Sequence, residues 1–118
     1  MQQPIVAALH FTVHEGGLAE FRRQADAIRQ QVDDTEEGVL FHAWYHDPAS
    51  GEVTLLDIYR DSATLVAHAA AARATLPGLL TVADLGAIDV YGDPSPEARA
   101  ALAGQPVTFA DPLTGFMR

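Results

Sequence analysis

The most informative change of hydrophobic pattern lies in residues 53–68, where an alternating segment passes directly into one with helical spacing. The first part is β-branched or long and apolar, with Asp57 and Tyr59 two positions apart on one face, which predicts a strand. Asp61 or Ser62 can then cap a helix, because their side-chain oxygens accept bonds from the free N–H groups of a first turn. Beyond the cap, one predicted helical face carries Leu65, His68, Ala69, Ala72 and Leu76.

This helical face is expected to pack on the sheet that contains the strand. His68 would then lie on the buried side of the helix, facing Asp57 or Tyr59. An imidazole, a carboxylate and a phenol directed at one gap make these three the candidate catalytic residues. The alternative is a structural role for all three, because buried polar groups can serve packing and hydrogen bonding alone.

The rest of the chain repeats these two periodicities in an order that defines a fold class. Alternation predicts strands at residues 5–14, 39–46 and 82–91, and an apolar stripe predicts a helix over residues 18–34. Pro77-Gly78 is expected to end the second helix. Strand, helix, strand, strand, helix, strand is the ferredoxin-like α+β plan, with a four-stranded antiparallel sheet.

The two middle strands are predicted to form a hairpin through the turn at residues 47–52. With the turn centred near Ala49, one face of this hairpin holds Val39, Phe41, Ala43 and Tyr45 together with Val53, Leu55, Asp57 and Tyr59. The other face holds Leu40, His42, Trp44 and His46 together with Leu56, Ile58 and Arg60. A register error of one residue would exchange these partners.

This register sets the expected substrate gap. Phe21, Phe41 and Tyr45 would line an apolar gap beside the candidate catalytic residues, with Leu65 on the second helix. Trp44 and His42 line the gap instead if the register differs, and otherwise belong to a subunit interface. We therefore include Trp44 among the candidate substrate-binding residues.

Residues 1–118 are expected to form one domain, with a ferredoxin-like core at 4–91 and a C-terminal extension at 92–118. In the extension, Ser95 can cap a short helix that runs through Ala103 and ends at Gly104. The tail from Val107 to Arg118 is too apolar to stay in water. Because the sheet is apolar on both faces, a second copy of the chain is expected to cover one of them, which predicts a homodimer.

Composition narrows the function classes. The formal charge of −9 argues against nucleic-acid binding, which needs a basic face. No segment has the apolar length of a membrane span or the pattern of a signal peptide, so a cytoplasmic location is expected. Cysteine is absent, which excludes disulfides and thiolate chemistry. Lysine and asparagine are absent too, which is typical of a GC-rich bacterial genome.

Metal and phosphate sites receive little support. His10 and His14, like His42 and His46, are four residues apart on strands, where about 13 Å would separate them. The acidic run at 33–37 lacks the spacing of a calcium loop. The pair Gly16-Gly17 lacks the further residues of a phosphate-binding motif, and a flexible corner explains it. No metal and no cofactor is expected.

The strand ending Leu-Leu-Asp-Ile-Tyr-Arg-Asp-Ser, followed by a helix with Leu65 and His68, resembles the antibiotic biosynthesis monooxygenase family. The resemblance covers residues 4–91, with Phe41 to His46 as the preceding strand. It implies ferredoxin-like domains that pair into dimeric α/β barrels. Haem-degrading members use an asparagine, a tryptophan and a histidine of the second helix. This chain has no asparagine, has Tyr59 in the tryptophan position and is alanine-rich after His68, which argues against haem degradation.

The resemblance implies cofactor-independent oxygenation of a small aromatic, quinol or polyketide-like compound. Such a substrate must become an electron-rich anion before it reacts with dioxygen, which requires a base and nearby hydrogen-bond donors. His68 is expected to be the base, Tyr59 a donor, and Asp57 an orienting group or second base. The alternative is a non-catalytic dimer of the same fold that binds a small ligand or has a structural role.

Overall fold

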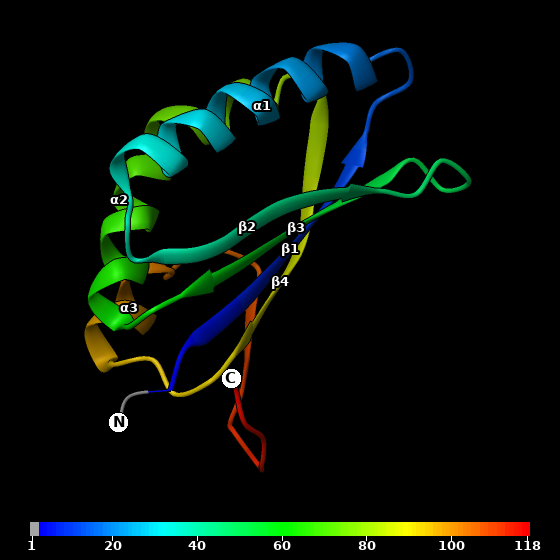
Figure 1. Ribbon diagram of the computed structural model, residues 1–118. Helices are drawn as coiled ribbons and strands as arrows, with labels where there is room; N and C mark the ends of the chain where they lie inside the picture. The colour runs from blue at the N-terminus through cyan, green and yellow to red at the C-terminus, as the bar shows by residue number, and fades with distance from the viewer. Residues whose placement is uncertain (1–2) are drawn as a thin grey trace.

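Two long helices cover one face of a five-stranded sheet in the computed structural model, which describes residues 3–118 (Figure 1). The sheet has the strand order β2-β3-β1-β4-β5. The first six elements of the chain form the predicted ferredoxin-like βαββαβ core. In chain order the elements are β1 (Ile5–Val13), α1 (Leu18–Thr35), β2 (Val39–His46), β3 (Glu52–Tyr59), α2 (Ser62–Leu79), β4 (Ala83–Tyr91), α3 (Pro96–Ala101) and β5 (Val107–Ala110).

The sheet is mixed and has one strand more than the sequence predicted. Strand β5 pairs parallel to β4, with Ile88 opposite Val107, and the Ile88 N–H donates to the Pro106 carbonyl at 2.9 Å. The prediction of a four-stranded antiparallel sheet was therefore wrong at this edge. Four residues are too few for a period of two to be recognised, so β5 could not be distinguished from a tail.

The predicted register of β2 was also wrong, because the strand contains an irregularity between Val39 and Phe41. Val39 pairs with Tyr59, but Phe41 pairs with Ile58, so one extra residue is accommodated in β2. Such a bulge exchanges the two faces of the strand beyond it. His42 and Trp44 consequently lie on the helix side of the sheet, opposite Asp57 and Leu55.

Helix α2 begins as predicted and ends later. Asp61 is the N-cap, and its side chain accepts hydrogen bonds from the N–H and the hydroxyl of Thr64, at 2.8 and 2.7 Å. Pro77 lies inside the helix and does not end it; the helix continues to Leu79. A proline removes only the bond from its own nitrogen, and the Leu80 N–H still donates to the Leu76 carbonyl at 3.1 Å, so the final turn persists.

The core lies between the helices and the sheet in two clusters. One contains Ile5, Ala7, Tyr59, Leu65, Ile88, Val90 and Ala98, and Val107 and Phe109 of β5 pack against it. The other contains Phe11, Phe21, Ala25, Val53, Leu55, Leu79 and Ala83. In the second cluster Phe11 and Phe21 pack edge to face, with ring centroids 5.5 Å apart.

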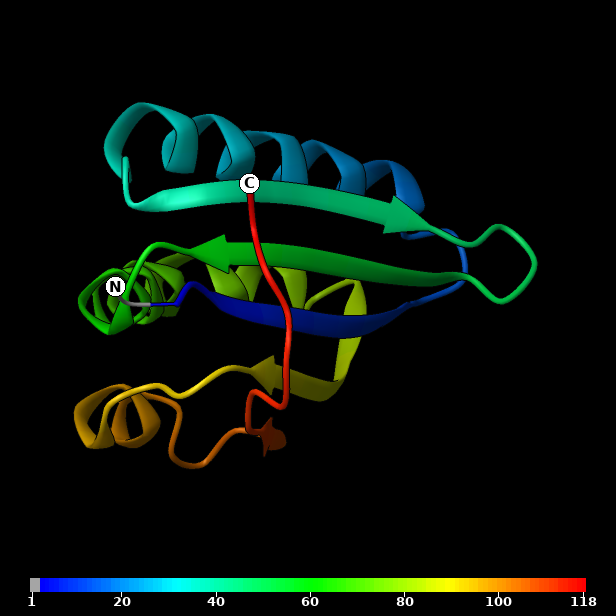
Figure 2. The ribbon, with the colours of Figure 1, turned by 60° about the horizontal axis from the view of Figure 1, so that its bottom comes forward.

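The opposite face of the sheet has no helix over it (Figure 1). Phe41, Tyr45 and Tyr91 are exposed there, although their strands are largely apolar. The C-terminal tail leaves β5 and extends on this open side, as the red segment in Figure 2 shows. Its Leu113, Phe116 and Met117 are exposed.

In the described part of the chain, no helix is long and apolar enough to cross a membrane.

Candidate active site

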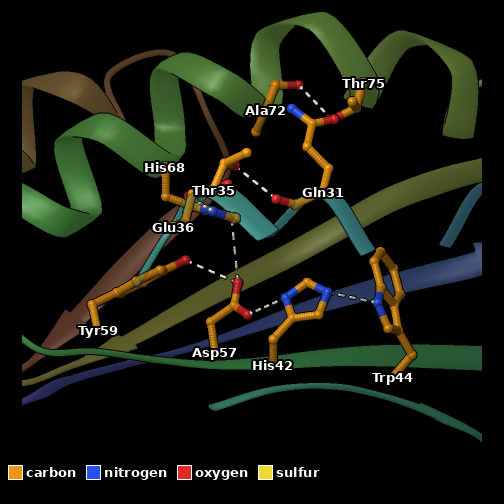
Figure 3. Close-up of polar contacts among 10 residues, drawn as sticks. All are labelled: Gln31, Thr35, Glu36, His42, Trp44, Asp57, Tyr59, His68, Ala72 and Thr75. Carbon is orange, nitrogen blue, oxygen red and sulfur yellow. Dashed lines mark hydrogen bonds and ion pairs between the residues drawn. The ribbon is translucent and has the colours of Figure 1, made fainter. Parts of the chain in front are cut away.

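Asp57 is the centre of a buried polar network on the helix side of the sheet (Figure 3). It lies in the middle of β3 and is 0% exposed. Its Oδ1 atom is 2.7 Å from His42 Nδ1, and its Oδ2 atom accepts a hydrogen bond from the Tyr59 hydroxyl at 3.0 Å. His68 Nε2 lies 3.5 Å from the same Oδ2 atom. One carboxylate therefore meets two imidazoles and a phenol.

Trp44 fixes the proton position on His42. The indole N–H of Trp44 lies 2.9 Å from His42 Nε2, and an indole nitrogen can only donate. His42 Nε2 must therefore accept, which places the proton of the neutral ring on Nδ1, the atom that faces Asp57. The residue chain Trp44–His42–Asp57 is thus a directed series of hydrogen bonds that ends on the carboxylate.

His68 lies between two carboxylates. Its Nδ1 atom is 2.7 Å from Glu36 Oε1, at the end of α1, and its Nε2 atom faces Asp57 at the longer distance. The short contact orients the ring with a proton on Nδ1 when Glu36 is ionised. The longer contact leaves Nε2 without a short hydrogen bond. His68 and Glu36 are mostly buried, at 12% and 13% side-chain exposure.

Tyr59 is held in its protonated form. Burial raises its pKa well above the usual value, and the negative charge of Asp57, the hydrogen bond to Asp57 and the charge of Glu36 act in the same direction. The hydroxyl is therefore a donor and not a base. In the folded protein this donor is already directed at Asp57.

The raised pKa of Tyr59 predicts a loss of stability at high pH. The unfolded tyrosine has a pKa of about 10, so above that pH the unfolded state releases its proton first. The favourable contribution is complete below about pH 10 and decreases as the pH rises toward the folded pKa. Between about pH 9 and 11, the free energy of unfolding measured with urea should fall more steeply with pH for wild type than for Tyr59→Phe.

Wild type and Tyr59→Phe are compared at one fixed protein concentration. Equal slopes for wild type and Tyr59→Phe would contradict the assigned burial effect.

Two small cavities adjoin His68 on either side of α2. The larger, about 110 Å³, lies between α2, the sheet and the C-terminal extension. The smaller, about 50 Å³, lies between α1, α2 and the sheet. Leu9, His68, Ala72 and Leu76 line both. His68 is therefore the titratable side chain that both cavities reach.

The structure brings His68, Tyr59 and Asp57 together, as the sequence indicated. His68 and Tyr59 line the larger cavity, whereas Asp57 lines neither cavity and contacts only the side chains around it. This placement favours an orienting role for Asp57 over that of a second base.

The predicted substrate-binding residues are dispersed. Leu65 lines the larger cavity and Trp44 the smaller one. Phe21 is buried in the core and reaches only a surface groove between α1 and β2. Phe41 and Tyr45 are exposed and line neither cavity beside His68, because the bulge in β2 turns them to the open face. In the described part of the chain, Phe21 and Tyr45 share the groove between α1 and β2, away from His68, and Phe41 lies outside it.

Glu36 was not predicted to be a site residue. Glu36 belongs to the acidic run after α1, whose members Asp33, Asp34 and Glu37 are exposed. Glu36 differs from these neighbours only because the chain turns toward β2 at this residue. The hydrophobic pattern does not show where that turn occurs. His42 was considered only for an alternative register, which is close to the one observed. Among residues 3–118, no three potential ligand side chains gather in a way that could hold a metal ion.

Comparisons with known proteins identify the family. The profile of the family "Antibiotic biosynthesis monooxygenase" matches residues 4–75. The structure of MupZ from Pseudomonas fluorescens is similar, with a TM-score of 0.85 and 17% identity over 99% of this chain and 96% of that one. No curated protein sequence matches the chain significantly.

Two provisionally assigned antibiotic biosynthesis monooxygenases share the core. The one from Caulobacter crescentus has a TM-score of 0.67 and 20% identity over 75% of this chain and 86% of that one. The one from Bacteroides thetaiotaomicron has a TM-score of 0.64 and 22% identity over 71% of this chain and 84% of that one. Identities this low support the fold. Because the family profile matches more than half of the chain, the protein belongs to the antibiotic biosynthesis monooxygenase family.

Proposed function

We propose that the protein is a cofactor-independent monooxygenase of a small aromatic or quinol substrate. The observation that carries this proposal is the position of His68, an imidazole in the wall of two apolar cavities, with a carboxylate at each ring nitrogen. This arrangement suits a general base, because both carboxylates stabilise the ring after it accepts a proton. Membership of the monooxygenase family supports the same reaction class.

The proton transfer follows from the tautomer of His68. Its Nδ1–H donates to Glu36, so the lone pair of Nε2 is free to accept a phenolic proton from a substrate in the larger cavity. The imidazolium that results lies 3.5 Å from Asp57. Asp57 in turn is held by Tyr59 and His42, so its charge is fixed in place before the reaction begins.

The oxygen step needs no reagent beyond substrate and dioxygen. The phenolate gives one electron to dioxygen, and the resulting radical and superoxide combine to form a carbon–oxygen bond. Protonation by the imidazolium gives a hydroperoxide. Cleavage of its O–O bond, with loss of the hydrogen on the same carbon, releases water and leaves a carbonyl. For a hydroquinone the sum is quinol plus O2 to hydroxyquinone plus H2O, which balances.

The size of the cavity limits the substrate. An engineered protein cavity of about 150 Å³ is known to hold benzene. The cavity of about 110 Å³ beside His68 thus suits one aromatic ring that partly displaces the surrounding side chains. A polycyclic, polyketide-like substrate would require the two cavities on either side of α2 to merge.

The direct test is oxygen uptake with purified protein, free of metal and flavin, on a panel of hydroquinones, anthrones and flavonols. We expect uptake with at least one compound, equimolar quinone formation, and incorporation of one atom from ¹⁸O2 into the product. Absence of enzyme-dependent uptake across the panel would contradict the proposal.

One observation favours a non-catalytic ligand-binding protein as the second candidate. Among residues 3–118, every buried side-chain nitrogen and oxygen has a hydrogen-bond partner without any ligand present. A network satisfied in this way can be purely structural. Binding of an aromatic compound without turnover in the same assay would support this second candidate.

We also propose that the protein is a homodimer formed through the open face of the sheet. The exposed Phe41, Tyr45 and Tyr91, together with the apolar tail, support this arrangement. Light scattering at micromolar concentration should give twice the 12.6 kDa monomer mass. Leu56→Arg, at the centre of the open face, should give the monomer because it places a charge in the interface.

The control is Ala27→Arg, on the exposed side of α1, which should remain dimeric. A wild-type protein that scatters as a stable monomer would overturn the arrangement.

A further inference from the structure

The C-terminal extension supplies one wall of the larger cavity. Leu102 and Gln105 line it from the segment between α3 and β5, opposite Ala69, Ala72 and Arg73 of α2. The cavity therefore closes only because the chain continues beyond the ferredoxin-like core.

The extension is firmly attached to that core. Ser95 caps α3 through a bond from the Ala98 N–H, and the Ser95 N–H donates to the Ser62 hydroxyl at 2.9 Å, which joins the starts of α3 and α2. Ala98 is fully buried in the first core cluster. The guanidinium of Arg99 lies 4.6 Å from the centroid of the Phe109 ring of β5. These contacts hold the wall against the core.

The similar structures differ in how much of this chain they match. The family profile ends at residue 75, and the Caulobacter and Bacteroides structures match 75% and 71% of the chain. The match to MupZ extends over 99% of the chain. A wall that varies within a family is a natural place for substrate selection, because the catalytic side chains remain on the shared core.

Arg73 gives the mouth of this cavity its charge. Apart from the titratable His68 and Tyr59, the lining of the cavity is apolar or neutral except for Arg73. Arg73 is exposed, and within residues 3–118 no carboxylate lies within ion-pair distance of it. An arginine that lacks a partner in a chain of net charge −9 is available to an anion from outside.

We infer that the substrate of the proposed monooxygenase is a single-ring aromatic acid, whose carboxylate binds Arg73 while its ring lies between α2 and the extension. This inference rests on the proposed function for the reaction, and on the cavity and Arg73 for the ligand. The ring contacts Leu65, Leu102 and Ile88, and the phenolic end reaches His68. Gln105 completes the polar rim of the mouth.

Calorimetric titration with 2,5-dihydroxybenzoate and its methyl ester tests this inference, because the two probes share a hydroquinone ring and differ in charge. Wild type should bind the acid about tenfold more tightly than the ester at low salt, a difference that 0.5 M NaCl should reduce. Arg73→Gln should lose the preference. Arg22→Gln, an equal change of charge on α1 outside the cavity, should keep it. Gln105→Trp should weaken the binding of both probes, because the larger side chain fills the mouth of the cavity.

The inference is overturned if neither probe binds, if both bind equally, or if Arg73→Gln keeps the preference. Oxygen uptake on both probes is measured separately. Uptake on the ester with no preference for the acid would leave the monooxygenase proposal intact and remove the aromatic acid. Arg73-dependent binding of the acid, without oxygen uptake on any quinol, would support the aromatic acid as the ligand and contradict the monooxygenase proposal.

Discussion

Replacing His68 with alanine is expected to lower the rate of oxygen uptake on an aromatic quinol by about 100-fold or more, the usual scale for loss of a general base. Among residues 3–118, His68 is the side chain in the wall of the larger cavity that can accept a proton, because burial keeps Tyr59 protonated and Glu36 lines only the smaller cavity. Oxygen-electrode rates at saturating quinol measure the effect.

The fold should survive this substitution. His68 borders two cavities, so its truncation enlarges existing space and removes few tight contacts. Glu36 loses its partner, but at 13% side-chain exposure it can reach water with a small movement. The melting temperature and the oligomeric state should therefore change little.

The matched control is His14→Ala, since His14 also contacts a carboxylate, that of Asp84 at 3.0 Å, but lies exposed just beyond the end of β1. It should retain wild-type oxygen uptake. If His68→Ala kept the wild-type rate and melted several degrees lower, His68 would be structural.

Replacing Asp57 with alanine should lower the free energy of unfolding by about 2–6 kcal/mol, because it leaves two buried donors without an acceptor and each costs about 1–3 kcal/mol. The loss leaves the Tyr59 hydroxyl and His42 Nδ1–H without an acceptor in a site that is 0% exposed at its centre. Urea unfolding at one fixed protein concentration measures it, because a dimer unfolds in a concentration-dependent way.

Two further variants separate charge from hydrogen bonding. Asp57→Asn should cost less than alanine, because the amide oxygen accepts from His42 while the amide N–H donates to a reversed Tyr59 hydroxyl. Asp84→Ala, which removes an exposed carboxylate bonded to His14, should change the free energy of unfolding by less than about 0.5 kcal/mol. Equal losses for Asp57→Ala and Asp84→Ala would contradict the assigned network.

The order of the core elements was predictable from periodicity because each long element buries one face. The inward face of α2 was predictable for the same reason: Leu65 and His68 recur at helical spacing, and both line the cavity. The pair Asp57 and Tyr59 on one face of β3 was also predictable, since a period of two places them together.

The failures have local physical causes. The bulge after Val39 adds one residue to β2, and a single added residue reverses a strand face without leaving any compositional trace. This is why Phe41 and Tyr45 were assigned to the site. Glu36 was missed for a separate reason. It lies 32 positions from His68 in the sequence, and only the packing of α1 on α2 brings the two side chains together.

The single tryptophan of the chain also makes the site optically visible. Trp44 donates its indole N–H to His42, and His42 reaches Asp57, so the only tryptophan chromophore is two hydrogen bonds from the centre of the network. It also lines the smaller cavity beside His68. Its emission therefore originates from one known location, and a change in that emission reports protonation of His42 or a guest in the cavity without an added label.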